Sequence, residues 1–298
     1  MAQLYDAITH NKRNSVFLIL AFILIVGLLS YFLGIFFASP AIGLIFGFFF
    51  ILVMMLIGYY GGNSLILAMH KAKEVQKKDD PYLVNTVEGL ALAAGIPTPK
   101  IYMIEESSPN AFATGRDPKH ASITVTSGLR SSLDRQELEG VIAHEMSHIK
   151  NFDIRYMMLV TILAGVVVLL SDFILRSFLF GGARSHNRKG GGIFLVLILL
   201  GIALAILSPI IAQIIKFAAS RQREYLADAS GAMLTRNPQG LANALKKIRD
   251  AKDKVVDDAN KATAHLFIEN PLRGLGGMNQ LFSTHPDINE RIRRLEKM

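Results

Sequence analysis

Residues 134–151 read Asp134-Arg-Gln-Glu-Leu-Glu-Gly-Val-Ile-Ala-His-Glu-Met-Ser-His-Ile-Lys-Asn151, and the rest of the chain is best interpreted outward from this stretch. Asp134 and Glu137 have the spacing of a helix N-cap and its capping-box partner. An apolar stripe at helical spacing follows, made by Leu138, Val141, Ile142 and Ile149. The stretch therefore predicts one helix that carries both His144 and His148.

Two histidines four residues apart can bind one metal ion, because they differ by only about 40° around a helix axis. Glu145 lies one position further round, where a carboxylate can take a proton from an attacking water and pass it to a leaving amine. This is the H-E-x-x-H arrangement, in which Zn²⁺ lowers the pKa of water to about 7. Because only three positions are fixed, the arrangement also arises by chance, and a third ligand is needed.

A third ligand is predicted in Ser220-Arg-Gln-Arg-Glu-Tyr-Leu-Ala-Asp-Ala229, where Glu224 and Asp228 again lie four residues apart. Glu224 completes a set of two histidines and one glutamate and leaves a fourth position for water. Asp228 can accept the second ring N–H of a ligand histidine and so fix its tautomer. The alternative is a solvated helix face on which the two carboxylates only pair with nearby arginines.

Composition limits the classes of protein that the chain can belong to. Of its 298 residues, 51% are hydrophobic and the mean hydropathy is +0.35, which indicates long apolar segments beside ordinary domain sequence. Cysteine is absent, which excludes disulfides and leaves histidines and carboxylates as metal ligands. The net charge is +8, but the basic residues are scattered beside apolar stretches. This pattern favours anionic lipid headgroups and predicts no nucleic-acid partner.

Two uncharged runs near the N-terminus, Val16–Phe37 and Ala41–Tyr60, predict a tight transmembrane hairpin. The first run spans about 33 Å at ~1.5 Å per residue, and the hydrocarbon core is ~30 Å thick. A cleaved signal peptide is the less favoured alternative, since its apolar part has about 7–15 residues and no second span follows it at once.

Two further apolar runs, Tyr156–Leu175 and Ile193–Ile215, are joined by the Gly-rich, basic residues 181–192. Polar residues interrupt or flank both runs, so either can be buried against protein or inserted only in part. Two arrangements of the four apolar runs in the membrane stay open. Either all four span it, or two span it and the other two form a shallow helical hairpin.

Basic residues near the ends of the runs predict the orientation of the chain. Basic residues favour the cytoplasmic side of a membrane, and most of them precede the first run or follow the second and fourth runs. A smaller basic group in residues 176–189 favours the opposite orientation. The balance places the N-terminus, residues 61–155 and residues 218–298 in the cytoplasm. Hairpins that cross and return put these polar segments on one face irrespective of charge, where they can form a single domain.

Three motifs together carry a resemblance to a known family. They are His-Glu-Met-Ser-His at 144–148, the stretch at 220–229, and Ser-Pro-Asn-Ala-Phe-Ala-Thr-Gly at 108–115. Over nearly the whole chain the sequence resembles the HtpX family of bacterial heat-shock membrane proteases, which belongs with the CAAX prenyl endopeptidases among the gluzincins. The resemblance implies a multi-pass zinc endopeptidase of the bacterial inner membrane, with a cytoplasmic active site and a stress-response role in quality control of membrane proteins.

A protease commonly holds its substrate as a strand added to a sheet edge. Lys100–Ile104 and Ala121–Thr126 predict strands, the second of them half-buried. Between them, the resemblance implies that residues 110–115 form the substrate-facing edge strand and that Asn110 bonds the substrate backbone. The alternative is a β-hairpin without a ligand role.

The C-terminal stretch Ser283–Leu295 predicts a short, basic, amphipathic helix that begins near Pro286 and Asp287. Its His-Pro pair resembles the C-terminal motif of the family. His285 is then a candidate to donate a hydrogen bond to the oxyanion of the reaction. A capping or surface histidine is the alternative.

These patterns predict a mainly α-helical integral membrane protein, with two to four transmembrane helices and a cytoplasmic zincin-like α+β peptidase domain that contains a small β-sheet. The expected divisions are a hairpin at 1–60, the first part of the peptidase domain at 61–155, a second hairpin at 156–217 and the second part at 218–298. The predicted function is zinc-dependent hydrolysis of peptide bonds in membrane proteins, with one Zn²⁺ per chain. Its partners are polypeptide substrates and the bilayer, and the oligomeric state stays open. The alternatives are a non-catalytic zinc-binding membrane scaffold and a processing protease for lipidated peptides.

Overall fold

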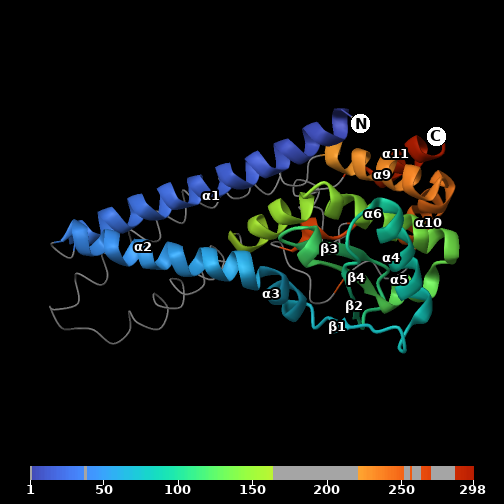
Figure 1. Cartoon of the computed structure of the whole chain (residues 1–298), viewed down its shortest axis with the longest axis horizontal. Helices are drawn as coiled ribbons and strands as arrows, with labels where there is room; N and C mark the ends of the chain where they lie inside the picture. Colours follow the sequence, from blue (N-terminus) through green and yellow to red (C-terminus); the bar gives the residue numbers. More distant parts are fainter. Residues whose placement is uncertain (1, 37–38, 164–220, 252–255, 257–262, 270–285) are drawn as a thin grey trace.

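The computed structural model describes residues 2–36, 39–163, 221–251, 256, 263–269 and 286–298. A pair of long helices extends from a compact part that contains the sheet and the remaining helices (Figure 1).

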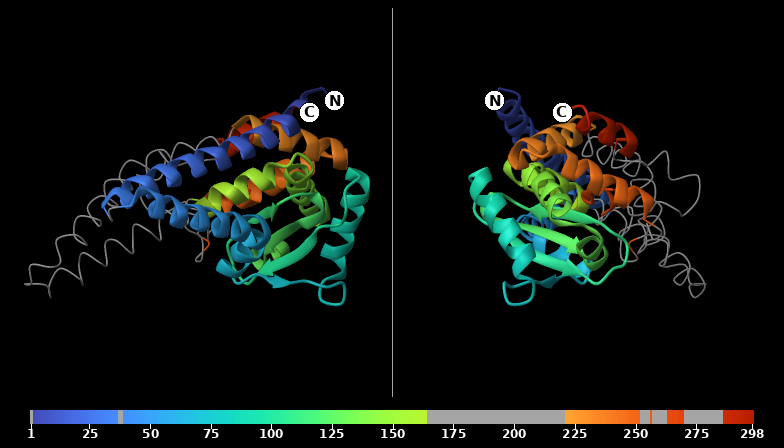
Figure 2. Two further views of the ribbon diagram at one scale, coloured as in Figure 1. Left: turned by 60° about the vertical axis from the view of Figure 1, so that its left-hand side comes forward. Right: turned by 90° about the vertical axis from the view of Figure 1, so that its right-hand side faces the viewer.

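The two long helices are α1 (Ala2–Phe36) and α2 (Pro40–Leu56), which lie side by side (Figures 1 and 2). Ser39 caps α2, because its side chain accepts a hydrogen bond from the N–H of Ile42 at 3.4 Å, and Pro40 occupies the first turn. The helices approach closely where Gly47 faces Ser30, since a Cβ at Gly47 would lie only 2.3 Å from Ser30 Oγ. The two predicted N-terminal runs therefore form two helices that pack against each other.

The second of these helices continues through a π-turn, η1 (Ile57–Gly61), into α3 (Gly62–Met69). Among the described residues, the stretch Pro40–Met69 alone is long and apolar enough to cross a bilayer, with a mean hydropathy of 2.7 and 11% of that window buried. The predicted run Ala41–Tyr60 lies inside it. The last turns belong to the compact part, because Ile66 is fully buried there.

Of the other three predicted runs, Val16–Phe37 falls almost wholly in α1. The third run is described only at residues 156–163, which are helical and mostly buried. Its remainder and the fourth run, Ile193–Ile215, lie outside the described residues.

The sheet has four strands in the order β1-β2-β4-β3. Their bounds are β1 (Lys73–Glu74), β2 (Lys100–Ile104), β3 (Ala111–Gly115) and β4 (Ala121–Thr126), with a 3-10 turn, η2 (Pro118–His120), between β3 and β4. The central pair β2 and β4 is parallel, and both outer strands run antiparallel to their neighbours. The predicted strands at 100–104 and 121–126 are confirmed, and β3 lies at one end of this strand order.

Both faces of the sheet are covered. On one face, Ala113 and Ile123 pack into a core shared with α4 (Pro81–Ala94) and α6 (Arg135–Lys150). On the other face, Phe112 packs with Ile66 and residues 157–162. The expectation that 121–126 is half-buried was wrong, because this second layer of helices also buries the polar residues of β4. Ser122 is one of them, and its hydroxyl accepts a hydrogen bond from Asn63 Nδ2 on α3 at 3.0 Å.

The remaining helices lie in the compact part, where α9 and α10 pack directly against α6 (Figure 1). They are α5 (Ser127–Ser132), α9 (Arg221–Thr235), α10 (Pro238–Asp250), the 3-10 turn η3 (Ala264–Leu266) and α11 (Ile288–Leu295). Two glycines allow close packing on α6. A Cβ at Gly140 would lie 2.6 Å from the backbone nitrogen of Leu241 on α10, and one at Gly231 on α9 would lie 3.0 Å from that of His144. The third-ligand helix α9 can therefore lie directly against the histidine helix.

Candidate metal centre and active site

The predicted metal helix is present as α6, and both halves of its capping box form. Asp134 accepts from the N–H of Glu137 at 3.0 Å, and Glu137 accepts from the N–H of Asp134 at 2.8 Å. Lys247 of α10 pairs with the same Glu137 carboxylate at 2.6 Å. The start of α6 is thus fixed both locally and by a neighbouring helix.

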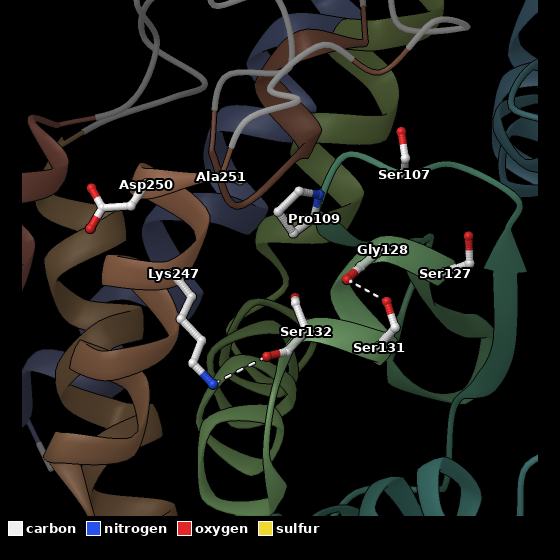
Figure 3. A pocket seen from close by; sticks show the side chains of 9 residues that line it. All are labelled: Ser107, Pro109, Ser127, Gly128, Ser131, Ser132, Lys247, Asp250 and Ala251. Carbon is white, nitrogen blue, oxygen red and sulfur yellow. Dashed lines mark hydrogen bonds between the residues drawn. The ribbon is translucent and has the colours of Figure 1, made fainter.

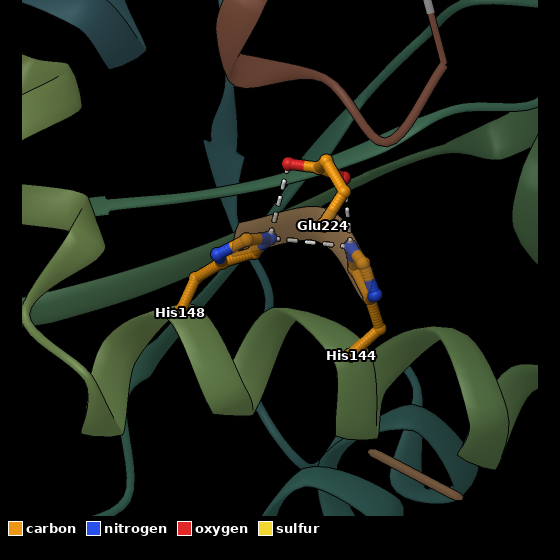
Figure 4. A group of neighbouring side chains, drawn as sticks. All are labelled: His144, His148 and Glu224. Carbon is orange, nitrogen blue, oxygen red and sulfur yellow. Dashed lines mark hydrogen bonds and ion pairs between the residues drawn. The ribbon is translucent and has the colours of Figure 1, made fainter. Parts of the chain in front are cut away.

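His144 and His148 of α6 and Glu224 of α9 come together in one group (Figure 4). One ligand atom from each lies within 4.8 Å of the others, and all three side chains are buried. The two Nε2 atoms are 3.2 Å apart, and the Glu224 oxygens lie 3.6 Å from His144 Nε2 and 3.7 Å from His148 Nε2. Two imidazoles and one carboxylate that converge on one point match the ligand set of a catalytic zinc site.

The far nitrogen of each imidazole is held by an aspartate. Asp228 Oδ1 lies 2.9 Å from Nδ1 of His144, and Asp153 Oδ2 lies 3.0 Å from Nδ1 of His148. A proton on each Nδ1 satisfies these carboxylates and leaves a lone pair on each Nε2, directed at the shared point. This arrangement of donors fits a divalent metal ion.

Asp228 is in turn held by Arg291 of α11. The guanidinium donates from Nε to Oδ2 at 2.9 Å and from Nη2 to Oδ1 at 2.7 Å, and the arginine is fully buried. Sequence reasoning missed this residue, although a signal was present. Ile288, Ile292 and Leu295 form the buried stripe of α11, and position 291 falls on that stripe. A charge at a core position of an amphipathic helix indicates a buried partner.

Sequence reasoning also missed Asp153. It follows the end of α6, beyond Phe152, which adopts a left-handed conformation with φ of 61°. This turn brings the Asp153 carboxylate back to His148, and no regular spacing in the sequence indicates it.

The electrostatics of the metal-free site follow from its burial. Burial lowers the pKa of His144, but hydrogen bonds to Asp228 and Glu224 outweigh this effect and raise it to about 9. Glu145, on the same helix, is 1% exposed. Burial raises the pKa of its carboxyl group, and the charges of His144 and His148 oppose the rise.

Asn110 lies immediately before β3, and its side chain bonds within the protein. Its Nδ2 donates to the carbonyl of Glu269 at 3.0 Å, and the N–H of Ile268 donates to the carbonyl of Ala111 at 2.9 Å. Residues 266–269, which we call the strap, thus lie antiparallel along the outer edge of β3, where Phe112 pairs with Phe267. The strap also reaches the metal centre, because the carbonyl of Ile268 accepts from Arg291 Nη1 at 2.8 Å.

His285, the candidate oxyanion donor, lies outside the described residues. The helix predicted after it is present as α11, and Asp287 caps it by accepting from the N–H groups of Asn289 and Glu290.

A separate hollow of about 770 Å³ lies between α5, the end of α10 and the loop at 107–109 (Figure 3). Lys247 crosses its floor and donates to the carbonyl of Ser132 at 3.1 Å. No member of the His144–His148–Glu224 group lines it, but Pro109 does. The hollow therefore adjoins the start of β3.

Comparison with known proteins places these features in a family. The model of peptidase family M48 matches residues 77–298. A protease HtpX homologue of Dictyoglomus thermophilum is 46% identical over 294 residues, covering 99% of this chain and 94% of its own. Homologues of Caldanaerobacter subterraneus and Listeria monocytogenes are 45% and 41% identical, covering 99% of this chain and 98% and 100% of theirs. The crystal structure of Ste24p from S. mikatae has a similar fold, with a TM-score of 0.53 and 22% identity, over 99% of this chain and 67% of that one.

Proposed function

The chain belongs to peptidase family M48 and is a zinc metalloprotease, and on this basis we propose that it cleaves misfolded or damaged membrane proteins from the cytoplasmic face of a bacterial cell membrane. The observation that carries the proposal is the buried His144–His148–Glu224 group beside Glu145, in a chain whose apolar helices leave the compact part.

The residues of the site divide the chemistry between them. When bound, zinc activates water and polarises the scissile carbonyl. The carboxylate of Glu145 takes the proton of the attacking water and delivers it to the leaving amine. A pKa raised by burial suits this exchange, because the same group must first accept the proton and then release it. Asp228 and Asp153 hold the ligand imidazoles in the tautomer that leaves Nε2 for the metal.

The substrate pairs as an antiparallel strand with the outer edge of β3, and Asn110 bonds its backbone. The strap supports this assignment, since it makes main-chain contacts of the expected kind with Asn110 and Ala111. The strap also occupies the outer edge of β3, so a substrate strand can pair with this edge only when residues 266–269 move away from it.

The apolar helices support a membrane-protein substrate. Phe46, Phe48 and Phe49 on α2 are each more than half exposed, which water disfavours and lipid accepts. The same helical stretch enters the compact part at α3 and contacts β4 through Asn63. A peptidase site anchored this way meets chain segments that emerge at the membrane surface.

One experiment tests the catalytic assignment. The purified full chain, its Glu145→Gln variant and a matched control, Glu139→Gln at a half-buried position of the same helix that pairs with Arg135, are compared for zinc content and cleavage of an unfolded protein. We expect zinc in all three and cleavage lost only in Glu145→Gln. Cleavage that persists in this variant contradicts the mechanism, and zinc-loaded wild-type protein that cleaves nothing favours a scaffold.

A second experiment tests the substrate class. The protein is reconstituted in liposomes together with a helical membrane protein or a destabilised point variant of it. Quality control requires faster cleavage of the destabilised variant. Equal cleavage rates contradict that role, and preference for a lipidated peptide indicates a processing protease.

A further inference from the structure

Asn11 connects the first helix to the metal centre. It lies on α1, a few residues before the apolar run, and is 1% exposed. Its Nδ2 donates both of its hydrogens, to Asp153 Oδ1 at 2.5 Å and to the carbonyl of Asn151 at 3.0 Å. Because both partners are acceptors, the amide nitrogen and not the amide oxygen must face them.

Asp153 divides its two oxygens between this helix and the metal ligand. Oδ1 accepts from Asn11, and Oδ2 holds Nδ1 of His148. The carboxylate is 2% exposed, so donors within the protein must stabilise its charge. Arg223 contributes a cation at longer range, with its Nη1 3.9 Å from Oδ1. The short bond from Asn11 is therefore the main geometric constraint on the carboxylate apart from the histidine.

A second contact from the same turn of α1 holds the backbone around Asp153. Lys12 Nζ lies 4.4 Å from the centre of the Phe152 ring, and Phe152 is the left-handed residue of this turn. Residues 151–153 are thus clamped by two consecutive side chains of α1, one on the carbonyl and carboxylate and one on the ring.

We propose that Asn11 is a positioning residue of the metal centre, which orients Asp153 and through it His148 from the helix that leads into the membrane. The proposal rests on the zinc site of the proposed function. It predicts that zinc affinity depends on a residue that touches neither metal nor substrate and that lies 137 positions before the ligand it positions. Carboxylates behind zinc-bound histidines typically contribute 10- to 100-fold to metal affinity.

The test measures zinc affinity of the full chain in detergent, by competition with a chelator and without substrate. We expect Asn11→Ala to weaken zinc binding about tenfold, and Asn11→Asp to weaken it more, since it places a second carboxylate against Asp153. Ser15→Ala is the matched control. It is buried one turn later on α1, and its hydroxyl bonds the helix carbonyl of Asn11. KM for a peptide should stay unchanged in Asn11→Ala while kcat at limiting zinc falls.

A double-mutant cycle separates positioning from a general loss of stability. In an Asp153→Asn background, Asn11→Ala should cost little further zinc affinity, because the carboxylate that it orients is gone. The proposal is overturned if Asn11→Ala lowers zinc affinity by the same factor in the Asp153→Asn background as in wild type. It is also overturned if the zinc affinity of Asn11→Ala lies within about twofold of wild type. A fall in the melting temperature of the zinc-free protein that accounts for the whole loss also overturns it. If wild-type protein binds no zinc, the proposed function itself fails. This outcome is distinct from failure of the Asn11 proposal, in which wild-type protein binds zinc and Asn11→Ala does not change its affinity.

Discussion

Arg291 is the largest fully buried side chain among the described residues, and it forms an ion pair with Asp228. Removal of one partner of such a pair leaves the other charged and buried, which costs about 3–5 kcal/mol. We therefore expect Arg291→Met to lower the free energy of unfolding by roughly this amount, measured by urea unfolding in detergent. The control is Arg293→Met, an exposed arginine on the same helix, which should leave the unfolding midpoint nearly unchanged. Equal effects of the two substitutions would contradict a buried pair.

The raised pKa of His144 predicts how zinc affinity depends on pH. Its folded pKa of about 9 lies above the ordinary 6.5, so metal-free protein gains stability from this proton below pH 6.5 and loses it as the pH rises through 9. Zinc must displace the same proton. Apparent zinc affinity should therefore rise about tenfold per pH unit between pH 6.5 and 9, and then level off.

Titration calorimetry in buffers of different ionisation enthalpy measures the protons released as zinc binds. Release of at least one proton at pH 7 is expected. An affinity that stays constant between pH 6.5 and 9 would show that His144 is neutral in the metal-free protein.

The site divides sharply into residues that spacing predicts and residues that it does not. Helical periodicity predicts His144, His148 and Glu224 as ligands. His144 and His148 lie four residues apart on one helix face, and Glu224 lies four residues before Asp228 on another. Arg291 and Asn11 act across long separations in the chain, whereas Asp153 reaches His148 through the left-handed turn at Phe152. The amphipathic stripe of α11 indicates that Arg291 is buried, but which residue it pairs with depends on how the helices pack around α6, and no local pattern contains that information.

At the scale of the element, the strap controls the outer edge of β3. Proline at position 268 removes the N–H that donates to Ala111, and one backbone hydrogen bond contributes about 0.5–1.5 kcal/mol net. Ile268→Pro should therefore free the edge more often and lower KM for an extended peptide about two- to tenfold.

The control for this prediction is Ile268→Val, which trims the side chain and keeps the N–H. Steady-state kinetics on one peptide compare the two variants with wild type. A higher KM in Ile268→Pro, with Ile268→Val unchanged, would indicate that the strap supports the substrate site and does not occlude it.

Local sequence patterns predicted the bounds of an element well where those bounds depend on that element alone. The capping box located the start of α6, a β-prone run located β2, and alternation located β4, both strands at their observed bounds. Alternation failed to predict burial, because it reports one covered face and β4 has two. The second cover comes from α3 and residues 157–162, whose approach to the sheet depends on the path of the hairpins.

At the scale of the whole molecule, both parts of the peptidase fold must lie on one side of the membrane. Leu92 on α4 is 84% exposed and Met233 on α9 is 79% exposed, and they flank the second pair of apolar runs in sequence. The chain has no cysteine, so Leu92→Cys and Met233→Cys each create a single thiol. We expect both thiols to react with a membrane-impermeant maleimide only after the inner membrane is made permeable.

Labelling of either cysteine in cells with an intact inner membrane would contradict the cytoplasmic assignment. Labelling of one and not the other would also contradict an even number of crossings between them, and so would exclude the shared domain. Zinc content of each variant serves as the check that the fold is intact.

The metal centre gathers side chains from α1, α6, α9 and α11, which reach from Asn11 to Arg291. During synthesis these residues leave the ribosome far apart in time. A nascent chain that has already placed its helices in the bilayer still lacks Glu224 and then Arg291, so its zinc site is incomplete. Translation order thus delays completion of the zinc site, and with it the onset of proteolysis, until the helix that carries Arg291 has been made.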